Sequence, residues 1–126
     1  MRYVVPVALL ITALIHALPL LGLTGGARLA NLYGIADMDA SLEILLRHRA
    51  VLFGLLAAFL VYAAFNRDLH GIALVGASIS VAAFLALAIT TGGYNQAVAT
   101  VVKVDLLAAV ALAAGWYAHL TRAGVP

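Results

Sequence analysis

The chain has 126 residues, of which 66% are hydrophobic and only 10% are charged. This balance lies far outside that of soluble globular proteins and indicates a membrane protein. The formal net charge is +2, and the seven basic residues are spread along the chain, which excludes a polybasic surface for nucleic acid. The chain has no cysteine, so disulfides, thiol redox centres and cysteine zinc sites are excluded as well.

Four apolar stretches are long enough to cross the hydrocarbon core of a bilayer, which takes about 20 helical residues. Turn-forming residues separate these stretches. We expect spans at about residues 3–23, 42–65, 70–91 and 97–120. The sequence therefore predicts an all-α fold, an integral membrane four-helix bundle that forms one domain over residues 1–126. Short loops make successive helices antiparallel neighbours.

The first span could also be a secretory signal peptide, because Gly25-Gly26-Ala27 resembles a small-residue cleavage site. We favour a retained helix, since the stretch is long enough to span and contains His16 and Pro19. A histidine next to a proline break has either a chemical role or a hydrogen bond across helices. The residues alone leave both alternatives open.

The longest connection, residues 24–41, carries apolar residues three and four apart between residues 27 and 33. This spacing predicts a short interfacial helix between spans one and two. Asp39 or Ser41 is the expected N-cap of span two.

Basic residues near the span ends predict the orientation. Once those expected within helices are set aside, Arg2, Arg67 and Arg122 lie at one end and Arg28 at the other. The positive-inside rule then places both termini in the cytoplasm.

Charged residues begin two of the spans. Glu43-Ile-Leu-Leu-Arg47-His48-Arg49 precedes sixteen apolar residues, too few to cross the core alone, and Asp105 is separated from Arg122 by sixteen residues. Part of each charged segment must therefore enter the membrane edge, where charge is costly and usually functional. The alternative is anchoring, in which Arg47, Arg49 and Lys103 extend to the headgroups while the carboxylates cap and pair them.

The antiparallel arrangement brings both charged segments to the end that holds residues 24–41, the turn at 92–95 and His16. We expect one polar layer near the outer face. Its candidate ligand-binding residues are His16, Glu43, Arg47, His48, Arg49, Tyr94, Asn95, Lys103 and Asp105. His16 and either Arg47 or His48 should line one pocket that opens towards residues 24–41.

Small residues indicate which faces pack. Span three presents Gly76, Ser80 and Ala83, with Ala73 and Ala77 beside them, at spacings that allow close helix contact, and span two presents Ala50, Gly54, Ala57 and Ala58. Extending the face of span two by one turn places Glu43 and Arg47 on it. We therefore expect these two side chains to point into the bundle, with His48 and Arg49 beside them. Arg47 should contact Glu43, Asp105 or both.

Three segments carry a family resemblance: His16-Ala-Leu-Pro-Leu, Ala27-Arg28-Leu-Ala-Asn-Leu-Tyr33-Gly34 and Leu46-Arg47-His48-Arg49-Ala-Val-Leu-Phe-Gly54. They resemble a bacterial family of small four-helix membrane proteins that is broadly DoxX-like. The resemblance covers nearly the whole chain and implies a four-helix fold in the bacterial inner membrane, with no catalytic residues to carry over. Some members are labelled phosphopantetheine adenylyltransferase, but this chain has neither the nucleotide-binding α/β domain nor the histidine motif of that soluble enzyme.

The leading functional hypothesis is that the polar layer binds a small amphipathic or anionic ligand of the quinone, lipid-headgroup or isoprenoid class, with the protein acting alone or as an accessory subunit. A second is an acid–base enzyme that pairs His16 or His48 with Glu43 or Asp105 on a lipophilic substrate. A third is a small dimeric transporter.

No H-x-x-x-H or E-x-x-H pair occurs, so no metal site is expected. The sequence leaves open whether a cofactor is bound and which one. The expected partners are the lipid bilayer and a small ligand, with a homo-oligomer or a larger membrane complex left open and no nucleic acid.

Overall fold

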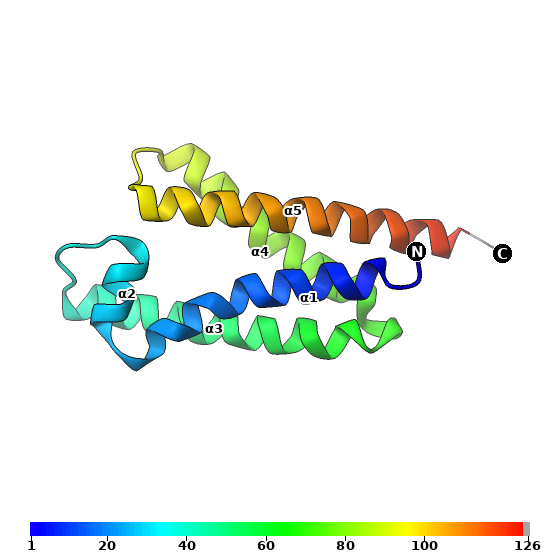
Figure 1. Ribbon diagram of the computed structural model, residues 1–126, viewed down its shortest axis with the longest axis horizontal. Helices are drawn as coiled ribbons and strands as arrows, with labels where there is room; N and C mark the ends of the chain where they lie inside the picture. Colours follow the sequence, from blue (N-terminus) through cyan, green and yellow to red (C-terminus); the bar gives the residue numbers. More distant parts are fainter. Residues whose placement is uncertain (125–126) are drawn as a thin grey trace.

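The computed structural model describes residues 1–124, and within that range the chain forms helices and connections without a strand (Figure 1). The elements in chain order are α1 (Val4–Ala17), the 3₁₀ helix η1 (Leu18–Thr24), α2 (Gly26–Tyr33), α3 (Ala40–Ala64), the 3₁₀ helix η2 (Arg67–Leu69), α4 (His70–Thr91) and α5 (Gln96–Ala123).

Four segments are long and apolar enough to cross a membrane: Val4–Leu23, Ala40–Ala64, Arg67–Thr91 and Gln96–Ala123. The predicted all-α bundle with four spans is therefore confirmed, and the protein is a multi-pass membrane protein. The short helix expected at residues 27–33 is α2. Asp39 is the N-cap of α3, because its Oδ1 accepts a hydrogen bond from the Leu42 N–H at 2.7 Å.

Successive spans run antiparallel, so both termini lie at one end of the bundle while α2 and the α4–α5 turn lie at the other (Figure 1). We call the latter the loop end. α1 packs between α3 and α5, and α4 contacts α3 and α5 from behind (Figure 1). The backbones of α3 and α5 do not approach one another anywhere in residues 1–124. Whether the space between α3 and α5 is filled therefore depends on how far α1 and the η1 segment after it extend into that space.

The core combines many alanines with a few larger side chains such as Leu9 and Leu60. On α4 the buried residues facing it are Ala73, Leu74, Ala77 and Val81. The predicted packing face was wrong in part, because Ala83 is exposed and Gly76 has no atom near the position of a Cβ. Large apolar residues such as Leu14, Leu55 and Val110 are more than 60% exposed on the outer surface, as expected for side chains that face lipid.

α5 closely approaches two other helices at Gly115, which the sequence analysis missed. A Cβ there would lie 3.1 Å from the Cβ of Ala8 on α1 and 3.1 Å from Cδ2 of Leu74 on α4. Three helices therefore meet at a position that has little room for a side chain.

We expect Gly115→Val to lower the thermal stability of the detergent-solubilised protein, because overpacking a tight core costs about 1–3 kcal/mol. Gly76→Val is the matched control, since a Cβ at Gly76 meets nothing within 4 Å. Equal unfolding temperatures for the two variants would contradict the packing described here.

Candidate functional site

α1 ends early, and this opens space at the loop end. It has 14 residues, against 25 in α3 and 28 in α5. Pro19 has no N–H for the Ile15 carbonyl, which accepts instead from the Leu18 N–H as the chain tightens into η1. η1 then follows α3, where Leu20 packs so closely on Gly54 that a Cβ would lie 2.6 Å from Leu20 Cδ2.

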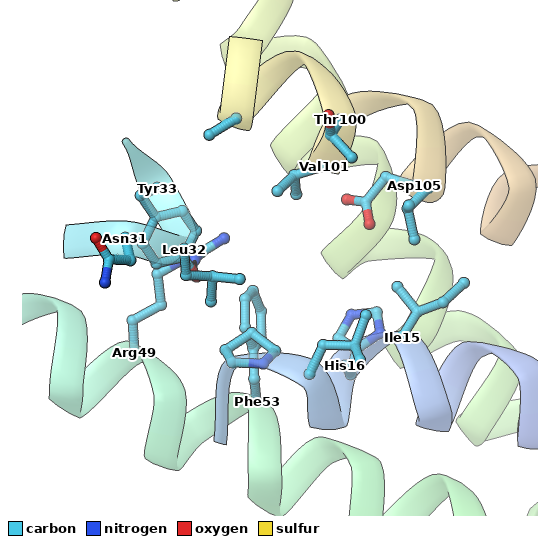
Figure 2. A pocket seen from close by; sticks show the side chains of 14 residues that line it. Ile15, His16, Asn31, Leu32, Tyr33, Arg49, Phe53, Thr100, Val101 and Asp105 are labelled. Carbon is cyan, nitrogen blue, oxygen red and sulfur yellow. Dashed lines mark hydrogen bonds between the residues drawn. The ribbon is translucent and has the colours of Figure 1, made fainter. Parts of the chain in front are cut away.

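A pocket of about 390 Å³ occupies this space, within the size range of small-ligand sites (Figure 2). Its walls come from the end of α1, η1, α2, α3 and α5, and most of the lining is apolar, with Phe53 on one side and Val101 and Val104 on the other. The polar side chains in the lining are His16, Asn31, Tyr33, Arg49, Thr100 and Asp105.

Arg49 is held in one wall by aromatic side chains. Its Nη1 donates a hydrogen bond to the Tyr33 hydroxyl, and its Cζ lies 4.3 Å from the centre of the Phe53 ring and 5.8 Å from that of Phe84. These distances are typical of cation–π contacts. Among the described residues no carboxylate forms an ion pair with Arg49. The guanidinium, which has five N–H donors, is thus fixed in place with donors left for a further partner.

Asp105 lies in the opposite wall, on α5. Only 9% of the residue is exposed, and its carboxylate points into the pocket (Figure 2). None of the hydrogen bonds or ion pairs formed within residues 1–124 involves this carboxylate. Its oxygen atoms open onto the pocket, since no fully buried side-chain oxygen in residues 1–124 lacks a hydrogen-bond partner, and a group in the pocket can supply the missing donor.

His16 closes the inner end of the pocket and uses both ring nitrogens. Its Nδ1 lies 2.9 Å from the Thr12 carbonyl oxygen, which can only accept, so Nδ1 carries a proton and donates. Its Nε2 lies 2.9 Å from the Ser80 hydroxyl on α4, and the ring meets Phe53 edge-on at 5.1 Å. Of the two alternatives for this histidine, the geometry supports the hydrogen bond across helices.

Asn95 fastens α2 to the start of α5 at the edge of the pocket. Its Oδ1 accepts from the Val98 N–H at 2.9 Å as the N-cap of α5, while its Nδ2 donates to the carbonyl oxygens of Tyr33 at 2.7 Å and Gly34 at 3.0 Å. Gly34 ends α2 with φ +64°, and a Cβ there would lie 2.9 Å from Asn95 Nδ2. Only glycine satisfies both constraints.

Glu43 and Arg47 lie outside the pocket, so the prediction that they point into the bundle was wrong. Arg47 Nη1 is 3.4 Å from Glu43 Oε1, its Nη2 donates to the Leu23 carbonyl at 3.2 Å, and the two side chains are 49% and 36% exposed. The Glu43 contact of Arg47 is present, but the contact with Asp105 is not. Arg49, two residues or about 200° further round the helix, faces the interior instead.

The reason lies in the small residues of α3. Ala50, Gly54 and Ala57 pack inward as expected, whereas Ala58 is exposed, so the packed face is turned away from the side of the helix that holds Arg47. Arg47 and His48 therefore do not share the pocket with His16, which was the predicted combination. His48 is exposed on the outer side of α3.

The predicted polar layer thus divides into parts. His16, Arg49 and Asp105 line the pocket, and Asn95 ties its edge. The remaining members lie elsewhere: Glu43 and Arg47 as a partly exposed pair, and His48, Tyr94 and Lys103 as exposed side chains outside the lining.

Sequence reasoning missed the apolar lining and four polar or aromatic pocket residues: Asn31, Tyr33, Phe53 and Thr100. Two signals were present. Phe53 is four residues after Arg49 and therefore lies on the same helix face. Tyr33 is the only aromatic residue of the predicted short helix.

No protein-family model, curated protein or solved structure matches this chain. The proposed function therefore rests on the fold and on the pocket.

We expect Arg49→Gln to destabilise the protein more than Arg47→Gln. The first change removes a hydrogen bond from a charged group, about 1.5–3 kcal/mol, and three aromatic contacts. The second removes a partly exposed ion pair, which contributes about 0–1 kcal/mol, and an exposed hydrogen bond to the Leu23 carbonyl, but no aromatic contact. Thermal unfolding in detergent measures both, and a larger effect at Arg47 would support interior packing of that residue instead.

Proposed function

We propose that this chain is a bacterial inner-membrane protein that binds a small amphipathic ligand in the pocket between α2, α3 and α5, with a polar group of the ligand at Arg49. One observation carries the proposal: a guanidinium fixed by aromatic rings faces a largely apolar cavity and has no carboxylate partner among residues 1–124. The protein acts alone or as an accessory subunit of a membrane complex.

The chemistry of the walls supports this class of ligand. A charge at membrane depth is costly unless a partner or ligand balances it, and such positions often mark binding sites. The planar fork of Arg49 suits an oxygen acceptor such as a carbonyl, carboxylate or phosphate. The apolar walls suit a hydrocarbon or ring body. Quinones, lipid headgroups with their first chain atoms, and isoprenoids combine these features. The DoxX-like resemblance supports the inner-membrane address and belongs to the same proposal.

Acid–base catalysis has less support. Both nitrogens of His16 are engaged, His48 is exposed outside the pocket, and Glu43 is paired with Arg47. A base within reach of a substrate in the pocket is therefore limited to Asp105.

Transport is also less supported, because His16, the ionisable residue deepest in span one, forms a hydrogen bond that links α1 to α4.

The proposal places both termini in the cytoplasm and the pocket near the outer face. Arg2 and Arg67 are exposed at the end of the bundle with the termini, whereas Arg28 is exposed on α2. Reporter fusions after residues 68 and 126 should give a cytoplasmic signal, and fusions after residues 35 and 94 a periplasmic one. The reverse pattern would overturn the orientation, and residues 35 and 68 on one side would overturn the fold.

Filling the pocket should remove the ligand. We expect protein purified in mild detergent to carry a small molecule that mass spectrometry identifies, and Val101→Trp, which projects into the pocket, to carry about tenfold less, since 1.4 kcal/mol of lost affinity is sufficient. Val110→Trp is the matched control, because Val110 is on α5 but faces outward with 68% exposure. Equal amounts in the two variants would contradict binding in this pocket.

A further inference from the structure

Arg49 and Asp105 face one pocket from opposite walls and do not pair with each other. They come from α3 and α5, whose backbones are not in contact in the described part of the chain. Figure 2 shows the carboxylate on the α5 side and the guanidinium on the side of α2 and α3. The pocket thus has a positive end and a negative end, and the two formal charges cancel.

The polar groups near Asp105 are already engaged. Thr100, one turn earlier on α5, donates its hydroxyl to the Gln96 carbonyl at 3.1 Å. The two nitrogens of His16 face Thr12 and Ser80. Asp105 itself is nine-tenths buried and points into the cavity. A hydrogen-bond donor for its carboxylate is therefore left to whatever occupies the pocket.

A ligand with a single negative charge would satisfy only one end. It would pair with Arg49, but it would leave the carboxylate of Asp105 unpartnered and add a second negative charge to the same cavity. Like charges in a low-dielectric site repel strongly, and an unpaired buried charge opposes binding. A ligand that accepts at one end and donates at the other satisfies both walls.

We infer that the ligand is a lipophilic molecule without net charge that offers an oxygen acceptor to Arg49 and a hydroxyl or amino donor to Asp105. This rests on the proposed function and narrows its ligand class, because fatty acids, phosphate headgroups and other simple anions are disfavoured. Asp105 then selects the ligand by accepting its donor hydrogen, while Arg49 orients the opposite end.

Three aryl ketones of one scaffold test this in purified protein in mild detergent. Each supplies the same carbonyl acceptor and apolar rings: para-hydroxybenzophenone adds a donor, para-methoxybenzophenone replaces it with an ether, and para-benzoylbenzoate adds an anion. Affinities are measured by titration calorimetry at a pH where the phenol is neutral. We expect the hydroxy probe to bind about tenfold more tightly than the methoxy probe, since its partner is a charged acceptor, and the anion to bind most weakly.

Two variants test whether Asp105 causes the preference for the hydroxy probe. In Asp105→Asn, an isosteric change, the advantage of the hydroxy probe should shrink several-fold and the anionic probe should gain affinity. Asp37→Asn is the control, because Asp37 is exposed and outside the pocket lining, and it should leave the ranking unchanged. The ranking on the native protein tests the inference even if Asp105→Asn does not fold.

The outcomes distinguish a failure of this inference from a failure of the proposed function. Tightest binding of para-benzoylbenzoate to native protein, or equal affinity for the hydroxy and methoxy probes, would overturn the inference and leave the proposed function standing. A preference that persists in Asp105→Asn would do the same. If none of the three probes binds and no small molecule accompanies the native protein on purification, the proposed function falls with it.

Discussion

The pocket depends on where α1 stops being an α-helix. Within the bundle α1 is what separates α3 from α5, and the missing N–H of Pro19 ends its regular hydrogen bonding just after His16. The chain then leaves the space between α3 and α5 and follows α3 as η1. A straight helix of full membrane length at this place would fill the cavity with its own side chains. The break in α1 therefore creates the volume of the pocket, and no additional residues are needed to form it.

The charged residues near the loop end serve different purposes according to the helix face that holds them. Arg47 pairs with Glu43 on the outside and donates to the Leu23 carbonyl, so it fastens η1 to α3. Arg49 is supported by aromatic rings and a hydroxyl, groups that orient a cation but do not neutralise it. Two arginines separated by one residue thus differ in what they can bind, because only the second keeps its charge available to a ligand.

α2 completes the site although an eight-residue helix has little stability of its own. It is held by the buried side chain of Leu29, which packs against Gly22, by Tyr33 under Arg49, and by the two carbonyl oxygens that accept from Asn95. The last two contacts belong to residues that also line or border the pocket. The wall of the site and the orientation of Arg49 therefore depend on the same few hydrogen bonds.

Span lengths, turns, a cap at Asp39 or Ser41 and the short second helix followed from the sequence alone, because they depend on local hydrophobicity and capping chemistry. The end of the bundle where charged residues gather followed from the same information. The face of α3 that points inward did not, since in a membrane the lipid-facing and core-facing sides are both apolar and small residues occur on each. The rotation of α3 turned Ala58 and Arg47 outward and brought Arg49 and Phe53 into the site. Only tertiary packing of α3 against α1 and η1 decided that rotation, and with it which charge faces Asp105.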